Sequence, residues 1–349
     1  NEPFFNVKGV DFLKLRASYG EMGNDQVFFN DELQEFAYLS TFGFGQYPIG
    51  GVVVTTLNEA LLANPNFTWE RANNTNIGLD ATLFRGQIDL TLEYFSNTRD
   101  QILIQKTGST PASSGINSLL PPVNAGEVKN SGFEFNVAWN GTVGDKGRFR
   151  IGLNGGQAKN EVIFLDEVPG IPDYQKLEGK PIGAYLVYES DGVFRNQEEI
   201  SANTIDYSGV TGLLLPGDMK FKDLNGDGVI DADDQNRIEN SITPNFNFGG
   251  TISFTWDAFD FSALFQGATG AFARFQTESG DIGNFLKYNH DNRWSIDNPS
   301  SEHPRLASRG DTYYTGGNFG NNSYFLFSKD FIRLKNIDLG YTLQTDESL

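Results

Sequence analysis

The sequence has 349 residues, a net charge of −19 at pH 7, no cysteine, and 30 phenylalanines within a hydrophobic fraction of only 38%. The acidic balance excludes nucleic acid as a partner, because no basic stripe is available to neutralise phosphates. The lack of cysteine excludes disulfides and thiolate metal sites, and no apolar run is long enough for a transmembrane helix. An acidic surface instead suits divalent cations, or neutral ligands such as sugars and peptides.

Apolar residues that alternate with polar ones predict eight β-strands. The clearest signal is the hairpin at residues 75–95, where Gly86 permits the positive φ of a tight turn. Each arm has about ten residues, roughly what a tilted strand needs to cross a bilayer. The predicted strands cover residues 12–20, 75–83, 88–95, 133–140, 149–153, 246–256, 259–265 and 331–343.

The connections between these strands are alternately long and short. In an up-and-down sheet this pattern places short turns at one end and long loops at the other, which is typical of an outer-membrane barrel. We therefore predict an all-β fold, an antiparallel transmembrane β-barrel with long extracellular loops. The alternative is a secreted, calcium-stabilised β-sandwich that acts as an adhesin or carbohydrate-binding module, but its outer apolar band would then be an exposed patch.

The two faces of the predicted strands differ in chemistry. The inward positions carry Asp80, Asp89, Glu93 and Glu134, and the pattern indicates no basic partners on the neighbouring strands. We therefore expect a wide, watery lumen in a barrel larger than eight strands. Two tryptophans, Trp139 and Trp256, fall at the short-turn ends of strands, where aromatic residues favour the lipid interface.

One segment, residues 223–234, matches the template of a calcium-binding loop. Short acidic and amide side chains at alternate positions of a tight loop can converge on a hard cation that needs six or more oxygens. The twelfth position of the template is an aspartate here, where an EF-hand has a glutamate, and no long helix precedes the loop. The alternative is a turn that binds no metal. The predicted Ca²⁺ ligands are Asp223, Asn225, Asp227, the Val229 carbonyl, Asp231 and Asp234.

Other candidate sites depend on aromatic residues. Trp294, Tyr313 and Tyr314 form a plausible sugar-stacking set in the last long loop. The alternative is that these rings pack the loop or contact a partner protein. No nucleophile elbow or acid–base pair can be identified, so the sequence does not predict an enzyme.

Seven stretches resemble the SusC/RagA family of TonB-dependent outer-membrane transporters, and they occur in the order found in that family. The segment at residues 64–80 resembles the family's Asn-Pro-x-x-x-Trp-Glu block, with Asn64, Pro65, Trp69 and Glu70 matching. The resembling stretches are residues 13–24, 64–80, 124–135, 181–194, 217–230, 261–270 and 331–343.

The resemblance implies a twenty-two-stranded barrel in the bacterial outer membrane. It implies import of glycans or peptides under a lid formed by a SusD-like surface lipoprotein, with energy from TonB. Residues 1–349 would be the C-terminal portion of this barrel, without its plug domain, TonB box, first strands and closing strands. Residues 158–245 would be a long extracellular loop that carries the calcium loop. A further alternative is a barrel of this family that serves in another envelope complex, such as a secretion machine.

Overall fold

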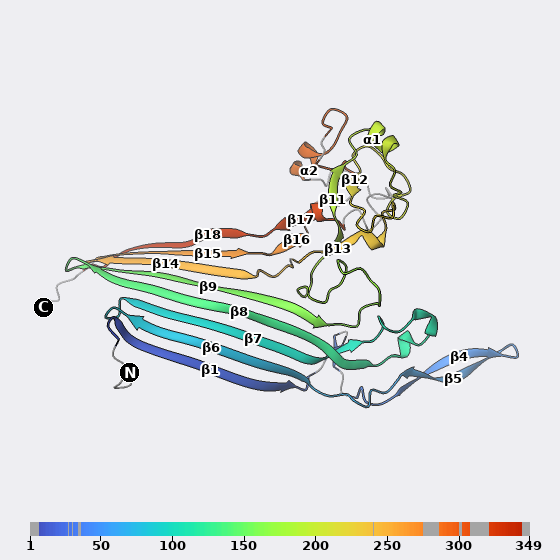
Figure 1. Ribbon diagram of the computed structural model, residues 1–349, viewed down its shortest axis with the longest axis horizontal. Coiled ribbons are helices and arrows are strands. Elements are labelled where there is room, and N and C mark those ends of the chain that lie inside the picture. Colours follow the sequence, from blue (N-terminus) through green and yellow to red (C-terminus); the bar gives the residue numbers. More distant parts are fainter. Residues whose placement is uncertain are drawn as a thin grey trace. The chain divides into compact units, whose positions relative to one another are not determined.

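The computed structural model describes residues 7–343 apart from 27, 30, 34–35, 240, 275–285, 300–301 and 308–320. Its main element is one eight-stranded antiparallel sheet whose strand order follows the chain (Figure 1). All eight predicted strands are confirmed, and most are longer than predicted. The strands are β1 (Val10–Asn24), β6 (Glu70–Leu83), β7 (Ile88–Gln105), β8 (Pro122–Val143), β9 (Gly147–Phe164), β14 (Phe246–Trp256), β15 (Phe259–Thr269) and β18 (Phe331–Tyr341).

The strand register sorts the side chains into alternating apolar and polar rows across the whole sheet, because successive residues of a strand point to opposite faces. One row reads Leu15, Leu79, Leu92, Phe135, Gly155, Phe248, Gly267 and Ile332. The next row reads Lys14, Asp80, Thr91, Asn136, Asn154, Gly249, Gln266 and Arg333. The sheet therefore has one apolar face and one polar face.

The apolar face is exposed. Leu15 is 77% exposed and Leu339 is 79% exposed, although both lie in regular strands of the sheet. In the described part of the chain, every other sheet has only two strands, so no second large sheet exists to make a sandwich. The β-sandwich alternative is therefore wrong. The polar face matches the expected inward surface of a barrel, and the apolar face matches its lipid-facing surface.

The connections follow the predicted alternation of lengths. Short turns join β6 to β7, β8 to β9, and β14 to β15, and Figure 1 shows them at one end of the sheet. Gly86 has a φ of +80°, as the tight turn between β6 and β7 requires. Long connections join the other consecutive strands of the sheet, and the one between β7 and β8 contains η1 (Ala112–Ser114) and η2 (Asn117–Leu119).

The expectation that the inward carboxylates have no basic partners on neighbouring strands is wrong for Asp80, which pairs with Arg16 on the adjacent strand β1. Two others, Glu93 and Asp89, pair with arginines that lie two strands away. Arg16 on β1 donates from Nε to Asp80 at 2.8 Å and from Nη2 to Glu93 at 3.3 Å. The Nη1 atom of Arg150 lies 3.9 Å from Asp89. Only Glu134 has no ion pair among the residues that the structure describes. The long arginine side chains reach across one or two strands, which a strand-by-strand reading of charge does not reveal.

Shorter secondary-structure elements lie within the long connections. Between β1 and β6 lie β2 (Phe28–Phe29), β3 (Glu32–Leu33) and a two-stranded ribbon of β4 (Thr41–Ile49) and β5 (Val52–Leu61). The ribbon turns at Gly50 and Gly51, and its Phe44 side chain is 84% exposed. Among the described residues, no helix has the length and apolar character needed to cross a membrane.

Two of the long connections fold together into a separate compact unit, which we call the loop unit (residues 171–243 and 270–329). Its core contains Tyr188, Val193, Phe194, Tyr207, Met219, Phe221, Ile230 and Phe325. Its elements are β10 (Leu186–Tyr188), β11 (Ser190–Val193), α1 (Gln197–Ala202), β12 (Met219–Phe221), η3 (Ala232–Asp234), β13 (Gln235–Arg237), β16 (Phe272–Arg274), α2 (Lys287–Asn292), η4 (Ser323–Phe325) and β17 (Leu326–Ser328).

The boundaries of the predicted loop at 158–245 therefore change. Strand β9 continues to Phe164, which pairs with Glu127 on β8, so this connection begins only after residue 164. Polar and glycine residues at 154–157 hide the alternation there, which explains the early end of the predicted strand. A pattern read along the chain does not indicate that this connection shares a core with the connection between β15 and β18.

Candidate functional site

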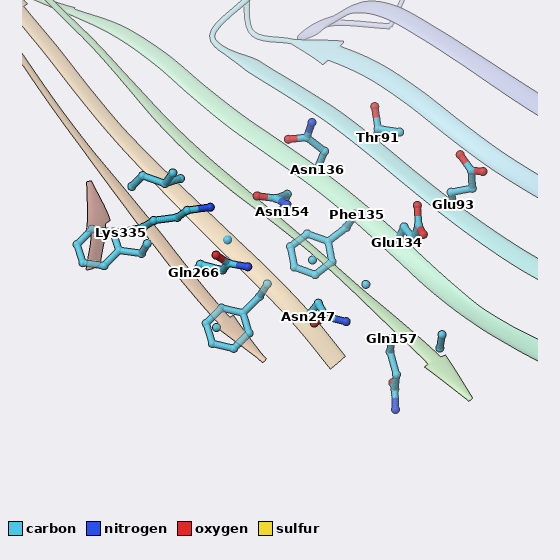
Figure 2. Close-up of a pocket in the computed structure, with 18 of the residues that line it drawn as sticks. Thr91, Glu93, Glu134, Phe135, Asn136, Asn154, Gln157, Asn247, Gln266 and Lys335 are labelled. Atoms are coloured by element: carbon cyan, nitrogen blue, oxygen red, sulfur yellow. The ribbon is translucent and has the colours of Figure 1, made fainter. Parts of the chain in front are cut away.

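The polar face of the sheet carries a hollow of about 680 Å³, which we call the amide-lined hollow (Figure 2). It has space because two strand positions on this face, Gly156 on β9 and Gly249 on β14, have no side chain. A Cβ atom at Gly249 would lie 2.8 Å from the Asn154 side-chain oxygen, and one at Gly156 would lie 3.2 Å from Glu134. The polar residues around it are Thr91, Glu93, Glu134, Asn136, Asn154, Gln157, Asn247, Gln266 and Lys335.

Few charged side chains line this hollow, and they differ in whether they form an ion pair. Glu93 and Glu134 are directly opposite each other on β7 and β8, an arrangement that normally destabilises a pair of strands. Glu93 forms an ion pair with Arg16, whose charge it shares with Asp80, and it also accepts a hydrogen bond from Asn76. Lys335 is the one basic side chain that lines the hollow. It lies where the pairing of β15 with β18 shifts, because Leu264 pairs with residue 336 and Phe265 with residue 334.

The amides give the hollow its chemical character. A carboxamide both donates and accepts hydrogen bonds, so a row of Asn and Gln side chains suits ligands that carry hydroxyl or peptide groups without net charge. These residues were not among the sites predicted from the sequence. The available signal was that Asn136, Asn154 and Asn247 all fall in step with the polar positions of their strands.

The predicted calcium loop is a tight, well-hydrogen-bonded turn on the loop unit. Asp223 accepts hydrogen bonds from the N–H groups of Gly226 at 2.7 Å and Gly228 at 2.8 Å. Asn225 and Asp227 accept from the backbone two residues further on. Ile230 is fully buried in the core of the loop unit, so it fixes the loop to apolar neighbours.

Asp234 closes this loop from its twelfth position. Its side chain is fully buried, and its two oxygens accept from Leu224 N at 2.8 Å and Asp231 N at 2.9 Å. Each carboxylate oxygen keeps a second lone pair, so these bonds do not by themselves prevent coordination. Among the described residues, however, no three His, Cys, Asp or Glu side chains are grouped closely enough to hold a metal ion. The calcium site therefore stays a prediction.

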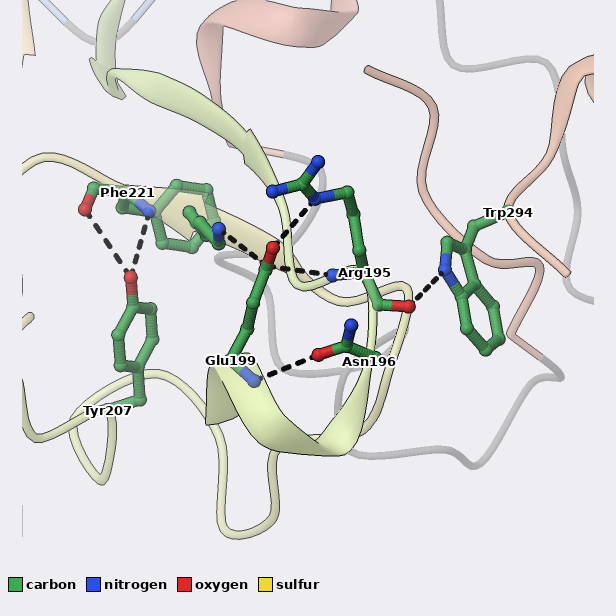
Figure 3. A network of polar contacts seen from close by, with 7 residues as sticks. Arg195, Asn196, Glu199, Tyr207, Phe221 and Trp294 are labelled. Atoms are coloured by element: carbon green, nitrogen blue, oxygen red, sulfur yellow. Dashed lines mark hydrogen bonds and ion pairs between the residues drawn. The ribbon is translucent and has the colours of Figure 1, made fainter. Parts of the chain in front are cut away.

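Trp294 is the one member of the predicted aromatic set that can be placed, because Tyr313 and Tyr314 lie outside the described residues. Its indole N–H donates to the Arg195 carbonyl at 3.0 Å (Figure 3). A Cβ atom at Gly217 would lie 2.7 Å from the indole ring, so one side of the ring lies against that backbone. The ring also lines a hollow of about 710 Å³, together with Pro216, Ile296 and Pro299 among others.

Helix α1 is held beside Trp294 by a network centred on Glu199 (Figure 3). Asn196 caps the helix by accepting from Glu199 N at 2.9 Å. The Glu199 carboxylate accepts from Lys220 Nζ at 2.8 Å, from Arg195 Nε at 2.6 Å and from Arg195 N at 3.0 Å. These donors, with the Lys220 contact foremost, hold the pKa of Glu199 at about 2, below its ordinary value of 4.5.

This pKa predicts an acid sensitivity of the loop unit. Because the folded-state pKa of Glu199 is depressed, its stabilisation is fully present above pH 4.5 and is lost as the pH falls towards 2. The carboxylate is partly exposed, so we expect a loss of about 2 kcal/mol from this group. Hydrogen exchange of α1 measured from pH 5 to pH 2 should show a smaller acid-induced loss of protection in Glu199→Gln than in the wild type. Equal pH profiles of the two proteins would contradict the assignment.

The two predicted interface tryptophans lie at the short-turn end of the apolar face. Trp139 pairs with Ile88 and Ile151 and is 50% exposed. Trp256 pairs with Gly147 and Phe259 and is 43% exposed. Their place in the sheet is the one that an aromatic girdle requires, while their contact with lipid stays a prediction.

Comparisons with known proteins identify relatives of the chain. The family described as TonB dependent receptor-like, beta-barrel matches residues 8–225. TonB-dependent receptor P26 of Formosa agariphila is 30% identical, over 96% of this chain and 33% of the relative. TonB-dependent receptor SusC of Bacteroides thetaiotaomicron is 25% identical, over 97% of this chain and 32% of the relative. The chain thus spans about a third of the length of these curated relatives.

Solved structures show the same fold. The structure of the RagAB peptide transporter is similar with a TM-score of 0.65 and 20% identity, over 99% of this chain and 36% of that chain. The RagAB peptide importer in its 'open-open' state gives a TM-score of 0.67 and 20% identity, over 98% of this chain and 35% of that chain. At this identity the likeness concerns the fold alone.

Proposed function

The chain belongs to the TonB-dependent receptor β-barrel family, and from this premise we propose that it forms part of an outer-membrane importer of glycans or peptides. The two solved structures that share this fold are described as the RagAB peptide transporter and the RagAB peptide importer. By analogy, a SusD-like surface lipoprotein would close over the barrel, and TonB would supply energy from the periplasm. No covalent chemistry belongs to this proposal.

The observation that carries the proposal is the polar row across the sheet and the amide-lined hollow within it. A barrel wall that presents Asn136, Asn154, Asn247 and Gln266 offers paired donors and acceptors to a passing ligand. Hydroxyl groups of sugars and amide groups of peptides can both use them. The bonds are individually weak, which suits a passage in which the ligand must also leave.

Replacing Asn154 with leucine tests this role. The substitution removes the donor and acceptor but keeps a side chain of similar size, so uptake should fall about threefold to tenfold, as the loss of one net hydrogen bond predicts. Uptake of labelled oligosaccharides and of labelled peptides would be measured separately in cells that express the protein. Whether oligosaccharides or peptides enter the cells identifies the class of substrate.

The matched control is Leu153→Val on the opposite, apolar face of the same strand. It should leave uptake close to the wild-type rate, because its side chain does not face the hollow. Unchanged uptake in Asn154→Leu would remove the amide-lined hollow from the route. Failure of the wild type to import either class would overturn the proposed function itself.

Trp294 supports the glycan side of the proposal. Its ring is fixed at the N–H edge by Arg195 and on one side by Gly217, so it is a rigid platform that loses little entropy when a ligand stacks on it. The apolar face of a sugar ring packs well on such a surface. The rim residues Asn196 and Gln197 carry amides that can bond to its hydroxyls.

We further propose that the loop at 223–234 binds Ca²⁺ as a structural ion that orders the loop unit. Two observations support this proposal: the segment matches nearly every position of the calcium-loop template, and hydrogen bonds to Asp223 fix the backbone of the turn. Calorimetric titration of chelator-treated protein with Ca²⁺ should give a saturable heat with one ion per chain. Asp223→Ala should abolish that heat, whereas Asp173→Ala, an exposed aspartate elsewhere in the loop unit, should not. A wild-type titration without heat would remove the site.

A further inference from the structure

A second hollow on the polar face lies at the short-turn end of the sheet and has the opposite charge character. It measures about 510 Å³, and we call it the basic hollow. It shares no lining residue with the amide-lined hollow. Its polar lining consists of Arg85, Gln87, Asn140, Thr142, Arg148, Arg150, Ser253 and Thr255.

Three arginines and no carboxylate line this hollow, in a chain whose net charge is −19. Arg148 pairs in register with Thr142 and Thr255, and Arg150 pairs with Asn140 and Ser253, so both arginines belong to the polar face. Within the described part of the chain, neither Arg85 nor Arg148 has a hydrogen-bonded or ion-paired side-chain partner. Such unpaired positive charge is unexpected where acidic residues outnumber basic ones.

Two carboxylates close to this end of the sheet, Asp89 and Asp11, are already engaged. Asp89 lies 3.9 Å from Arg150, but it also accepts from Thr82 and Asn140, each at 3.2 Å. Asp11 accepts from the Gly86 N–H at 3.0 Å and does not line the hollow. Arg150 donates to the Asn140 oxygen at 2.7 Å, which fixes its guanidinium beside the hollow.

The remaining lining groups add hydrogen-bond donors. Thr142, Ser253 and Thr255 carry hydroxyls, and Gln87 carries an amide. A guanidinium presents a planar fork of N–H groups that matches carboxylate and phosphate oxygens, and several such forks around one concave surface reinforce each other. A neutral sugar or an uncharged peptide could accept hydrogen bonds from these groups, but only an anion is also attracted by their three positive charges. The chemistry therefore points to an oxyanion.

We propose that the basic hollow is a binding site for an oxyanion group, a phosphate or a carboxylate, at the short-turn end of the polar face. This inference goes beyond import and does not depend on it, because a ligand can bind here whether or not the barrel transports anything. Two sources share this chemistry: a small free anion, and an acidic polypeptide segment that reaches this end of the barrel.

The test uses the whole protein in neutral detergent micelles, titrated by calorimetry with inorganic phosphate in one arm and hexaglutamate in the other. Binding of phosphate identifies a small-anion site, and binding of hexaglutamate alone identifies a site for polypeptide carboxylates. The second result would be informative because the acidic chain as a whole repels the peptide. Arg148→Gln should weaken binding about tenfold, as the loss of a charged hydrogen bond predicts, and raising the salt from about 50 to 200 mM should weaken it further.

The matched control is Arg99→Gln, which removes an exposed arginine from the polar face of β7 near Glu70, outside the hollow. It should leave the affinity unchanged. Arg148→Lys, which keeps the charge but loses the fork, should give an intermediate loss. Folding of each variant is verified by its heat-modifiable migration on gels. The proposal is overturned if neither probe binds, or if Arg99→Gln weakens binding as much as Arg148→Gln.

Discussion

Replacing Asp218 with alanine is expected to unfold the loop unit while the eight-stranded sheet stays assembled. Asp218 is fully buried and accepts from Arg305 Nε at 2.6 Å, and Arg305 is itself only 14% exposed. The substitution removes the carboxylate that neutralises the Arg305 guanidinium, and breaking a buried pair in this way typically costs about 3–5 kcal/mol. That is a large fraction of the stability of a small folded unit. The sheet has its own strand pairing and contacts, so it should not depend on this pair.

Limited proteolysis of the protein in outer-membrane preparations measures this effect. Asp218→Ala should yield early fragments cut within residues 171–243 and 270–329, whereas the wild type resists. Asp173→Ala is the matched control, because Asp173 is 94% exposed in its pair with Lys176 and such pairs contribute little. Similar protease resistance of the two variants would show that the buried pair does not stabilise the unit as argued.

Replacing Ile252 with arginine is expected to prevent or strongly weaken assembly of the sheet in the outer membrane. Ile252 lies in the middle of β14, pairs with Ile151 and Ala263 on the apolar face, and is 40% exposed. A charged side chain at the middle of a lipid-facing surface costs about 2–4 kcal/mol. The expected readout is a lower urea concentration for unfolding in lipid vesicles and less heat-modifiable protein on gels.

Thr251→Arg is the control at the adjacent position of the same strand. Its side chain belongs to the polar face, where water can solvate the new charge, so assembly should be close to that of the wild type. The comparison holds strand, length and introduced residue constant and changes only the face. Equal damage from both substitutions would mean that the apolar face does not contact lipid.

The sheet could be predicted from the sequence because its determinants are local. Alternation along a strand depends on about ten consecutive residues, and the turn at Arg85 and Gly86 depends on only a few neighbouring residues. The strand order followed from connection lengths alone. Strand ends were harder, because at Gly155 and Gly156 the alternation is interrupted while the ladder to β8 continues.

The sites could be predicted only where one short segment carries them. The turn at 223–234 is such a segment, because all of its candidate ligands lie within twelve consecutive residues. The partnership of Arg16 with Asp80 and Glu93 joins three strands, and the arginines of the basic hollow come from a turn and from β9. Such groupings depend on register across the sheet, which a linear pattern does not specify.

The loop unit has a consequence for the order in which the chain folds. Its core joins residues that are far apart in sequence, as shown by the hydrogen bond from Ser190 N to the Ser323 hydroxyl, 133 residues away. Closing so long a loop is slow and entropically costly, but the hairpin of β14 and β15 shortens the path, since Asn245 N bonds to Thr269 O at 3.2 Å. Once formed, the hairpin holds the two segments of the loop unit close together at residues 245 and 269. We therefore expect the loop unit to fold only after the neighbouring strands have paired, and its protease resistance to be a late marker of correct membrane insertion.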